Sequence, residues 1–294
     1  MTAPFHIIIP ARYAATRLPG KPLLDLGGKT MIARVVDCAR RSAAASVTVA
    51  TDDARIVEAA AAAGARALLT AATHPSGSDR IDEAAAQLQL GADDIIVNLQ
   101  GDEPRMPAAL INQVAARLAS DPQAAMATAS APLDDAAQLA DPAVVKVVTC
   151  ARGYALYFSR AAIPWGGDAA AGDSADGDAA DDSADGDADA TAGDSDSTAD
   201  GAAAAGPATA PRRHIGIYAY RRDYLRRFAA RGACALERCE RLEQLRALWH
   251  GARIACVEAV QAPPPGVDTA ADVERLRAVD WPEKLIEPAR KCRL

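Results

Sequence analysis

Three cationic side chains lie within one short segment near the N-terminus, PARYAATRLPGKPLL at residues 10–24: Arg12, Arg17 and Lys21. The segment directly follows an apolar run typical of a β-strand, and open α/β sheets bind ligands at the carboxyl ends of their strands. Charge-assisted donors in this number suit the oxygens of a polyphosphate, although a solvated basic loop explains the cluster when it is taken in isolation. The segment matches neither GxGxxG nor GxxxxGK[ST], so hydride transfer and ordinary ATPase chemistry both lose support.

Two carboxylates follow a later predicted strand, in VNLQGDEP at residues 97–104. Asp102 and Glu103 are expected at the same edge of the sheet as the basic segment. Mg²⁺ is a hard cation that proteins hold with one or two carboxylates together with phosphate oxygens. Gly-Asp-Glu-Pro also has the chemistry of an ordinary turn, so the motif alone leaves a magnesium site and a turn both open.

A further carboxylate, Asp268, precedes the last predicted helix in PGVDTAADVERLR, residues 265–277. Thr269 and Asp272 have the spacing of a capping box, which is a wholly structural role. Asp268 is not needed for that cap. It could complete a metal site, and a plain residue at the start of a helix fits the pattern equally well.

Other polar groups have ordinary structural explanations when each is taken alone. Ser78, in HPSGSDR at residues 74–80, could cap the next helix. His214 begins a predicted strand, where an isolated histidine is usually structural. Glu243 and Gln244 lie beside the apolar stripe of residues 242–249, a pattern more typical of a helix face than of a site.

The elements that must position these residues alternate between short β-rich runs and helical runs. Strands are predicted over residues 6–9, 46–50 and 94–99, and helices over residues 29–42 and 54–64. Strands separated by helices imply right-handed βαβ units and a mostly parallel sheet. We therefore expect an α/β fold with a mostly parallel central sheet and helices on both of its faces.

The second half of the chain adds a small antiparallel extension. The runs 144–150 and 155–160 are separated only by residues 151–154, which predicts a hairpin. The later elements are predicted as a strand over 215–220, a helix over 236–249, a strand over 253–260 and a helix over 269–279.

The negative charge of the chain is concentrated in one segment. Residues 166–211 contain only Gly, Asp, Ala, Ser, Thr and Pro. Twelve of them are aspartates, so the net charge of −7 for the whole chain corresponds to +5 for the rest of the chain. Such a segment cannot bury enough apolar surface to offset its ordering entropy, so we predict a disordered insertion. Its DxD repeats lack the spacing and terminal Glu of an EF-hand loop. One α/β domain is expected over 1–165 and 212–281, with a C-terminal tail over 282–294.

The bulk properties exclude several classes of protein. A pI of about 5.2 argues against general nucleic-acid binding. No stretch reaches the roughly 20 apolar residues of a membrane-spanning helix, and the apolar run near the N-terminus is too short for a signal peptide. The six cysteines are scattered without zinc-site spacing, so we expect reduced thiols and a cytoplasmic location, with no nucleic-acid or membrane partner.

Taken in order, these motifs resemble the 3-deoxy-manno-octulosonate (Kdo) cytidylyltransferase family. The resemblance covers roughly residues 5–278 apart from the acidic segment. The wider sugar nucleotidyltransferases share only the first basic segment and the QGDEP-like element, whereas SGSDR, RHIGIY and LEQLR narrow the resemblance to the Kdo family. The matching segments are 10–24, TDD at 51–53, 74–80, 97–104, VVKVV at 144–148, YFSRAAIPW at 157–165, RHIGIYAYR at 213–221, 242–249 and GVDT at 266–269.

The resemblance implies a Rossmann-like nucleotidyltransferase fold and an enzyme that uses CTP and Kdo as substrates. Such enzymes transfer CMP from CTP to the anomeric hydroxyl of Kdo for lipopolysaccharide biosynthesis, releasing pyrophosphate, with Mg²⁺ as cofactor. In-line attack of this kind depends on positioning and charge neutralisation more than on covalent catalysis. The family also implies a homodimer.

The resemblance assigns roles to individual residues of this sequence. The catalytic residues are Arg12, Lys21 and Asp102. Asp102 and Asp268 are assigned to the metal. The nucleotide is assigned to Ala11, Arg12, Arg17, Lys21, Ser76, Arg80 and Gln100. The sugar is assigned to Arg160, His214, Tyr218, Glu243 and Gln244.

Two alternatives stay open from the sequence. A cytidylyltransferase for another acceptor, such as sialic acid or methylerythritol phosphate, would share the nucleotide motifs. A non-catalytic nucleotide-binding protein would keep the fold, but it would be expected to lose Asp102 or Asp268, and both are present.

Overall fold

The structure is a computed structural model that describes residues 3–14, 18–133, 135–165, 210–279 and 281. The strands are β1 Phe5–Ala11, β2 Ser46–Thr51, β3 Arg66–Leu69, β4 Ile95–Asn98, β5 Met126–Pro132, β6 Lys146–Thr149, β7 Ala155–Ser159, β8 Arg212–Arg221 and β9 Ile254–Glu258. The helices are η1 Lys21–Leu23, α1 Met31–Arg40, α2 Ala54–Ala62, α3 Gly77–Gln87, α4 Ala108–Ala119, α5 Ala136–Ala140, α6 Arg222–Ala229, α7 Ala235–Glu240, α8 Leu245–Trp249 and α9 Ala270–Arg277.

Two of the predicted segments have no structural test. The acidic insertion, apart from residues 210 and 211, and the tail over 282–294 lie outside the described residues. None of the helices in the described part of the chain has the length and apolar character needed to span a bilayer.

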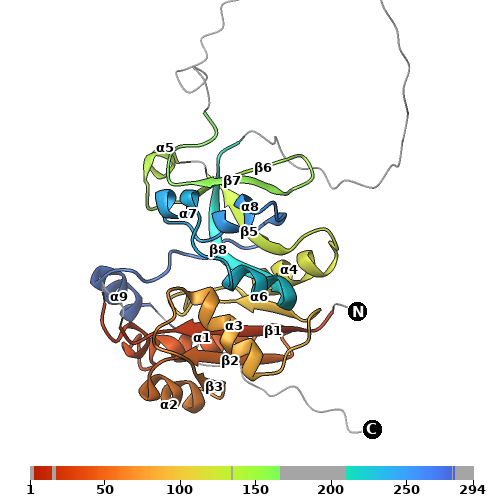
Figure 1. Ribbon diagram of the computed structural model, residues 1–294. Coiled ribbons are helices and arrows are strands. Elements are labelled where there is room, and N and C mark those ends of the chain that lie inside the picture. The colour runs from red at the N-terminus through yellow and green to blue at the C-terminus, as the bar shows by residue number, and fades with distance from the viewer. Residues whose placement is uncertain (1–2, 15–17, 134, 166–209, 280, 282–294) are drawn as a thin grey trace, which may run out of the picture.

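The strands of the described chain form one sheet with the order β3-β2-β1-β4-β8-β5-β9. Figure 1 shows β1, β2 and β3 at one end of this sheet, and β5 and β8 farther along it. The four strands β3, β2, β1 and β4 are parallel. Strand β8 then runs antiparallel to both of its neighbours, and β9 is parallel to β5. The predicted hairpin is confirmed as β6–β7, which meets β8 where Lys146 pairs with Arg213. The mostly parallel sheet with an antiparallel part is therefore confirmed.

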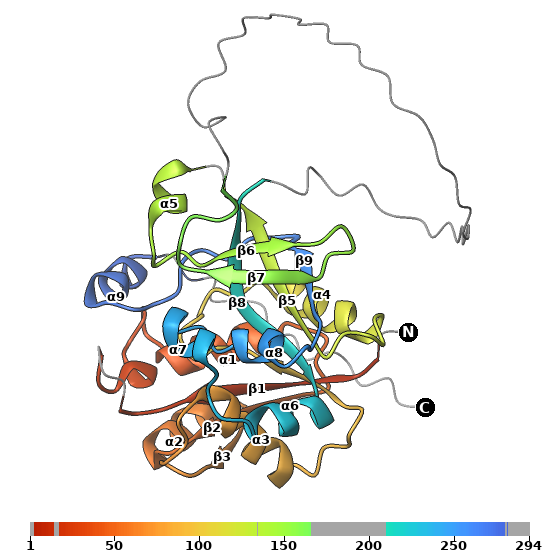
Figure 2. The same cartoon turned by 45° about the horizontal axis from the view of Figure 1, so that its top comes forward.

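Helices cover both faces of this sheet (Figure 2). On one face, Ile7 and Ile9 of β1 pack in a core cluster with side chains of α1, α2 and α4. On the other face, Ile8 packs in a second cluster with side chains of α3, α6 and α8. Since successive side chains of a strand point to opposite faces, the apolar run of β1 supplies both clusters.

The helix predicted over residues 236–249 is wrong, because the chain forms two helices there. Helix α7 begins with a capping box between Cys234 and Glu237, and it ends at Arg241. Arg241 has φ 55° and ψ 44°, a left-handed conformation that cannot continue a right-handed helix. The segment between the two helices carries Glu243 and Gln244, so the break decides where these predicted site residues lie.

The carboxyl ends of β1 and β4 approach each other closely at Gly101. A Cβ atom at this position would lie 2.8 Å from the Pro10 carbonyl oxygen and 3.6 Å from the Ala11 Cβ. Backbone atoms cannot rotate away as a flexible side chain can. Only glycine therefore lets the two strand ends lie side by side, and these strand ends carry the basic and acidic motifs.

We predict that Gly101→Ala lowers the free energy of unfolding by about 1–3 kcal/mol, because the added methyl group must push the Pro10 backbone aside. Urea denaturation of the variant and the wild type measures the effect. The matched control is Gly232→Ala, since a Cβ at Gly232 meets no described heavy atom within 4 Å. Equal stability of the Gly101→Ala variant and the wild type would contradict the prediction.

Candidate active site

A cavity of about 370 Å³ opens at the carboxyl ends of β1 and β4. The basic segment, the start of α3, the turn after β4 and Asp268 in the segment before α9 all line it. Eight residues predicted to bind the nucleotide or the metal lie in its wall: Ala11, Arg12, Lys21, Ser76, Arg80, Gln100, Asp102 and Asp268. Arg17, the other residue in that prediction, lies outside the described residues. The fold thus brings together residues from distant parts of the chain.

Lys21 joins the two predicted metal ligands. Its Nζ atom lies 2.8 Å from Asp102 Oδ2 and 3.5 Å from Asp268 Oδ1. The Val267 amide donates a 3.0 Å hydrogen bond to the Asp102 carbonyl oxygen, which aligns the segment before α9 with the turn after β4. A Cβ at Gly266 would lie 2.9 Å from a carboxylate oxygen of Glu103 and 3.1 Å from the Asp102 carbonyl oxygen, so glycine favours the close approach of these two segments.

The donor chemistry of this cluster fits Mg²⁺. Asp102 and Asp268 present hard carboxylate oxygens to one cavity, and Mg²⁺ is usually held by one or two carboxylates plus substrate phosphates rather than by a complete protein cage. The described residues include no group of three or more His, Cys, Asp or Glu side chains arranged to hold a metal ion.

Glu103, next to Asp102, stands in a different environment from its neighbour. Burial, together with the nearby carboxylates of Asp102 and Asp268, raises the pKa of Glu103 to about 8 against the opposing effect of Lys21. At neutral pH this side chain is therefore mostly protonated. The charge of Lys21 is then shared between Asp102 and Asp268.

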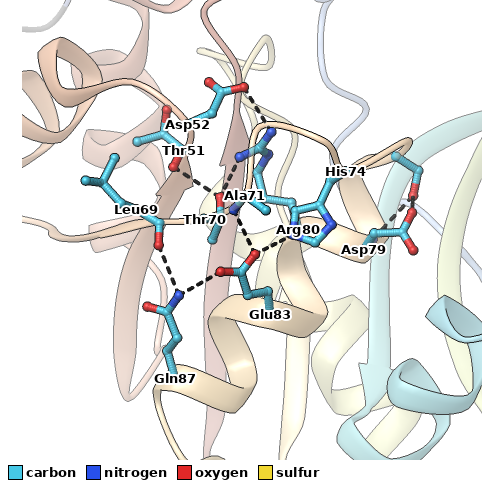
Figure 3. Close-up of polar contacts among 11 residues, drawn as sticks. Thr51, Asp52, Leu69, Thr70, Ala71, His74, Asp79, Arg80, Glu83 and Gln87 are labelled. Atoms are coloured by element: carbon cyan, nitrogen blue, oxygen red, sulfur yellow. Dashed lines mark hydrogen bonds and ion pairs between the residues drawn. The ribbon is translucent and has the colours of Figure 1, made fainter.

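One carboxylate ties the basic segment to the start of α3. Asp52, just after β2, accepts a 3.2 Å hydrogen bond from the Tyr13 amide and a 3.1 Å hydrogen bond from a terminal nitrogen of Arg80. The other terminal nitrogen of Arg80 donates to the Thr70 hydroxyl (Figure 3). The Arg80 side chain is almost fully buried, and its guanidinium is fixed in orientation before any ligand binds.

The loop before α3 is also held by its own polar contacts. Ser76 is the N-cap of the helix and accepts a 3.3 Å hydrogen bond from the Asp79 amide, so the cap predicted at Ser78 is wrong. Ser78 is fully buried instead. His74 pairs with Glu83, which also accepts a hydrogen bond from the Ala71 amide (Figure 3).

The predicted sugar residues on β8 lie beside the strand that leads into the acidic motif. Tyr218 pairs with Asn98, the last residue of β4. The ring centroids of His214 and Tyr218 are 5.4 Å apart, and those of His214 and Phe158 are 4.9 Å apart in a T-shaped arrangement. These rings form an aromatic wall that continues from the end of β4 toward the β6–β7 hairpin.

His214 is held in its neutral form. Its Nε2 atom lies 2.9 Å from the Thr128 hydroxyl oxygen, and that hydroxyl donates to the Ile217 carbonyl oxygen at 2.8 Å. Since the single hydroxyl hydrogen is used on the carbonyl, Nε2 must carry the hydrogen and donate to Thr128. Burial lowers the pKa of His214 to about 3.

Glu243 and Gln244 lie in the turn between α7 and α8. Burial raises the pKa of Glu243, while the Ser76 hydroxyl and the Arg246 guanidinium, 3.9 Å away, oppose the shift. Glu243 therefore adjoins the cavity wall at Ser76. Gln244 is 5% exposed, and its Nε2 atom has no hydrogen-bond partner among the described residues. A buried amide without an acceptor is costly unless a ligand supplies one.

Arg160 is held at the end of β7 by the last residue of α7. The Arg160 amide donates to Glu240 Oε2 and its Nε donates to the Glu240 carbonyl oxygen, both at 2.9 Å. The Ser159 hydroxyl donates to Glu240 Oε1 at 2.6 Å, and an Arg160 terminal nitrogen donates to the Pro142 carbonyl oxygen. Glu240 thus couples Arg160 to the turn that carries Glu243. No motif marks Glu240 in the sequence, because its role depends on contacts between α7 and the end of β7.

The chain matches a known family along most of its length. The family described as Cytidylyltransferase matches residues 6–254. The chain belongs to this cytidylyltransferase family. It is accordingly a nucleotidyltransferase, as the motifs predicted.

Curated relatives indicate which enzymes within the cytidylyltransferase family this chain resembles. The chain is 50% identical over 278 residues to a 3-deoxy-manno-octulosonate cytidylyltransferase of Pseudomonas syringae pv. tomato, covering 94% of this chain and 98% of the relative. It is 50% identical over 275 residues to the enzyme of the same name from Hahella chejuensis, covering 94% and 97%. The predicted resemblance to the Kdo cytidylyltransferase family is confirmed.

Solved structures agree with the fold. The structure of a CMP:2-keto-3-deoxy-manno-octonic acid synthetase complexed with CTP has a TM-score of 0.76 and 38% identity, covering 94% of this cytidylyltransferase and 98% of that chain. A 4-diphosphocytidyl-2C-methyl-D-erythritol synthase, at 12% identity and a TM-score of 0.54, covering 94% and 98%, shares the fold alone. The predicted Rossmann-like nucleotidyltransferase fold is therefore confirmed.

The buried His214 makes folding stability depend on pH. In the unfolded chain this imidazole has a pKa of about 6.5. Below that pH the unfolded state binds a proton that the folded state does not bind, which favours the unfolded state. The stabilisation is fully present above pH 6.5 and is lost as the pH falls toward 3, with a slope of about 1.4 kcal/mol per pH unit. Urea denaturation at pH 7, 6 and 5 measures it.

The control for this pH dependence is His214→Gln, which removes the titrating group. We expect the variant to lose less of its own stability than the wild type between pH 7 and pH 5, because other groups titrate equally in both proteins. Identical slopes for the two proteins would show that His214 is not buried in its neutral form.

Proposed function

We propose that this cytidylyltransferase transfers CMP from CTP to the anomeric hydroxyl of Kdo, forming CMP-Kdo and pyrophosphate for lipopolysaccharide biosynthesis. The observation that carries the proposal is the cavity that Arg12 and Lys21 line together with Asp102 and Asp268. The 50% identity to Kdo cytidylyltransferases supports Kdo over sialic acid as the acceptor.

The cationic side of the cavity is proposed to hold the triphosphate. Arg12, Arg17 and Lys21 would neutralise the phosphate oxygens and stabilise the leaving pyrophosphate. The cytidine would lie against the opposite wall, where the buried guanidinium of Arg80 is already oriented by Asp52. The residues proposed to line this part are Ala11, Ser76, Arg80 and Gln100.

Asp102 and Asp268 are proposed to hold Mg²⁺. When bound, the ion would polarise the α-phosphate and neutralise charge that develops during the transfer. Lys21 keeps the two carboxylates close together, and it reaches the same cavity as Arg12.

The acceptor is proposed to lie between β8 and the turn after α7. Arg160 uses its Nε and one terminal nitrogen on backbone carbonyls, which leaves its second terminal nitrogen for the Kdo carboxylate. Glu243 and Gln244 would bind sugar hydroxyls, and the Gln244 amide would gain the acceptor that it lacks. His214, neutral at physiological pH, and Tyr218 would form the wall.

A cytoplasmic homodimer is proposed for the assembled enzyme. The thiols of Cys38, Cys150, Cys234, Cys239 and Cys256 are free, as expected in a reducing compartment. Leu156 on β7 and Trp165 after it are 59% and 86% exposed, and such apolar side chains suit a contact with a second copy near the hairpin.

A pyrophosphate-release assay tests the function. We expect release with CTP, Mg²⁺ and Kdo together, because each is needed for the in-line transfer. No release is expected when UTP replaces CTP, when sialic acid replaces Kdo, or when a chelator removes the metal. Release with sialic acid but not with Kdo would show that sialic acid, rather than Kdo, is the acceptor.

We predict that Asp102→Asn lowers turnover by about 100-fold or more, because a metal ligand that is worth several kcal/mol loses its charge. Steady-state rates with saturating CTP and Kdo measure the loss. The melting temperature should stay close to that of the wild type, since the Asp102 side chain is 39% exposed and partly solvated ion pairs contribute little to stability.

The matched control for this substitution is Asp37→Asn. Asp37 pairs with Lys29 at 2.7 Å, away from the cavity, so the same chemical change breaks a similar ion pair. Turnover of this variant should equal that of the wild type. Unchanged turnover of Asp102→Asn would show that Asp102 does not hold the metal.

A further inference from the structure

Gly216 lies in β8 between two predicted sugar residues, His214 and Tyr218. Ile215 and Ile217, on either side of it, are buried in the core cluster that contains α1 and α4. Because side chains alternate along a strand, position 216 belongs to the same face as the two aromatic rings. The glycine therefore leaves a gap in the aromatic wall.

The backbone conformation does not require glycine at this position. The glycines with positive φ among the described residues are Gly20, Gly27, Gly28, Gly64, Gly153 and Gly251, and Gly216 is not one of them. Any L-amino acid can adopt its backbone angles. Glycine inside a strand also weakens the strand, since it adds chain entropy to the unfolded state and packs no side chain.

Packing does not require glycine either. A Cβ built at Gly216 meets no heavy atom within 4 Å among the described residues. The situation differs from that of Gly101 and Gly266, where the protein backbone or a neighbouring side chain fills the space that a Cβ would take. The space above Gly216 is open.

The strand is irregular at the same place. The register between β5 and β8 shifts between Thr128 and Ala129, which pair with Tyr218 and Ile215. Gly216 and Ile217 thus form a bulge, and the Thr128 hydroxyl holds it by donating to the Ile217 carbonyl oxygen. Bulges next to active sites re-aim side chains, and glycine in a strand marks places where a ligand approaches the backbone closely.

We propose that Gly216 is a specificity-determining residue, whose missing side chain lets the acceptor sugar lie against the β8 backbone between His214 and Tyr218. The inference rests on the proposed function in so far as that function places the acceptor beside β8. The chemistry favours a polyhydroxylated sugar acid, because its carbon skeleton can pack on the aromatic rings while its hydroxyls reach the exposed strand backbone.

The test introduces side chains of increasing size, Gly216→Ala and Gly216→Val. The wild type is assayed first with CTP and each of Kdo, sialic acid and methylerythritol phosphate, and the variants are then compared for the acceptor that the wild type uses. We expect the KM for that acceptor to rise about tenfold for Ala and further for Val. The KM for CTP should stay within twofold, and the melting temperature should equal or exceed that of the wild type.

The control is Gly232→Ala, another glycine without positive φ whose added Cβ meets no described heavy atom within 4 Å. Its KM values should match those of the wild type. An unchanged acceptor KM in Gly216→Val, an equal rise in both KM values, or unfolding of both Gly216 variants would overturn the inference. A wild type that does not use Kdo overturns the proposed acceptor instead, so the two failures are distinguishable.

Discussion

The ammonium of Lys21 holds together two carboxylates that would repel each other if they stood alone. Asp102 comes from the turn after β4 and Asp268 from the segment before α9, and both lie within 3.5 Å of one nitrogen atom. The hydrogen bond from the Val267 amide to the Asp102 carbonyl oxygen also aligns these two segments. The cluster combines carboxylates that suit a metal ion with cations that suit a triphosphate, so the chemistry of the cavity depends on this one ion pair network.

Because of the sheet topology, that cluster lies at one end of a longer row of predicted site residues. Strand β8 runs antiparallel to β4, and Tyr218 pairs with Asn98, so the aromatic wall begins beside the strand that leads to Asp102. The turn between α7 and α8 reaches the other side of the cavity through Glu243, next to Ser76. In the proposed function, the nucleotide would lie at the cavity and the acceptor beside β8.

The local elements were predictable where a periodic apolar pattern was strong. The first strand, the helix that begins at Met31 and the β6–β7 hairpin agree closely with the predicted ranges. The patterns did not single out β5, whose sequence MATASAP has small residues and no apolar alternation; its position between β8 and β9 makes it a buried strand. The helix predicted over 236–249 failed, because a left-handed residue and the contacts of Glu240 with β7 interrupt a sequence of good helix formers.

By itself, the sequence determined the α/β class, the family resemblance and the identity of the groups that line the cavity, because motifs and periodicity are local properties of the chain. Only the tertiary structure decided how those groups differ from one another. It buried Glu103 and left Asp102 partly exposed, gave Arg80 the partner Asp52, and made Gly101 a necessity of packing while leaving the space at Gly216 open. Burial, charge pairing and steric space are set by neighbours that are distant in sequence, and no spacing of residues encodes them.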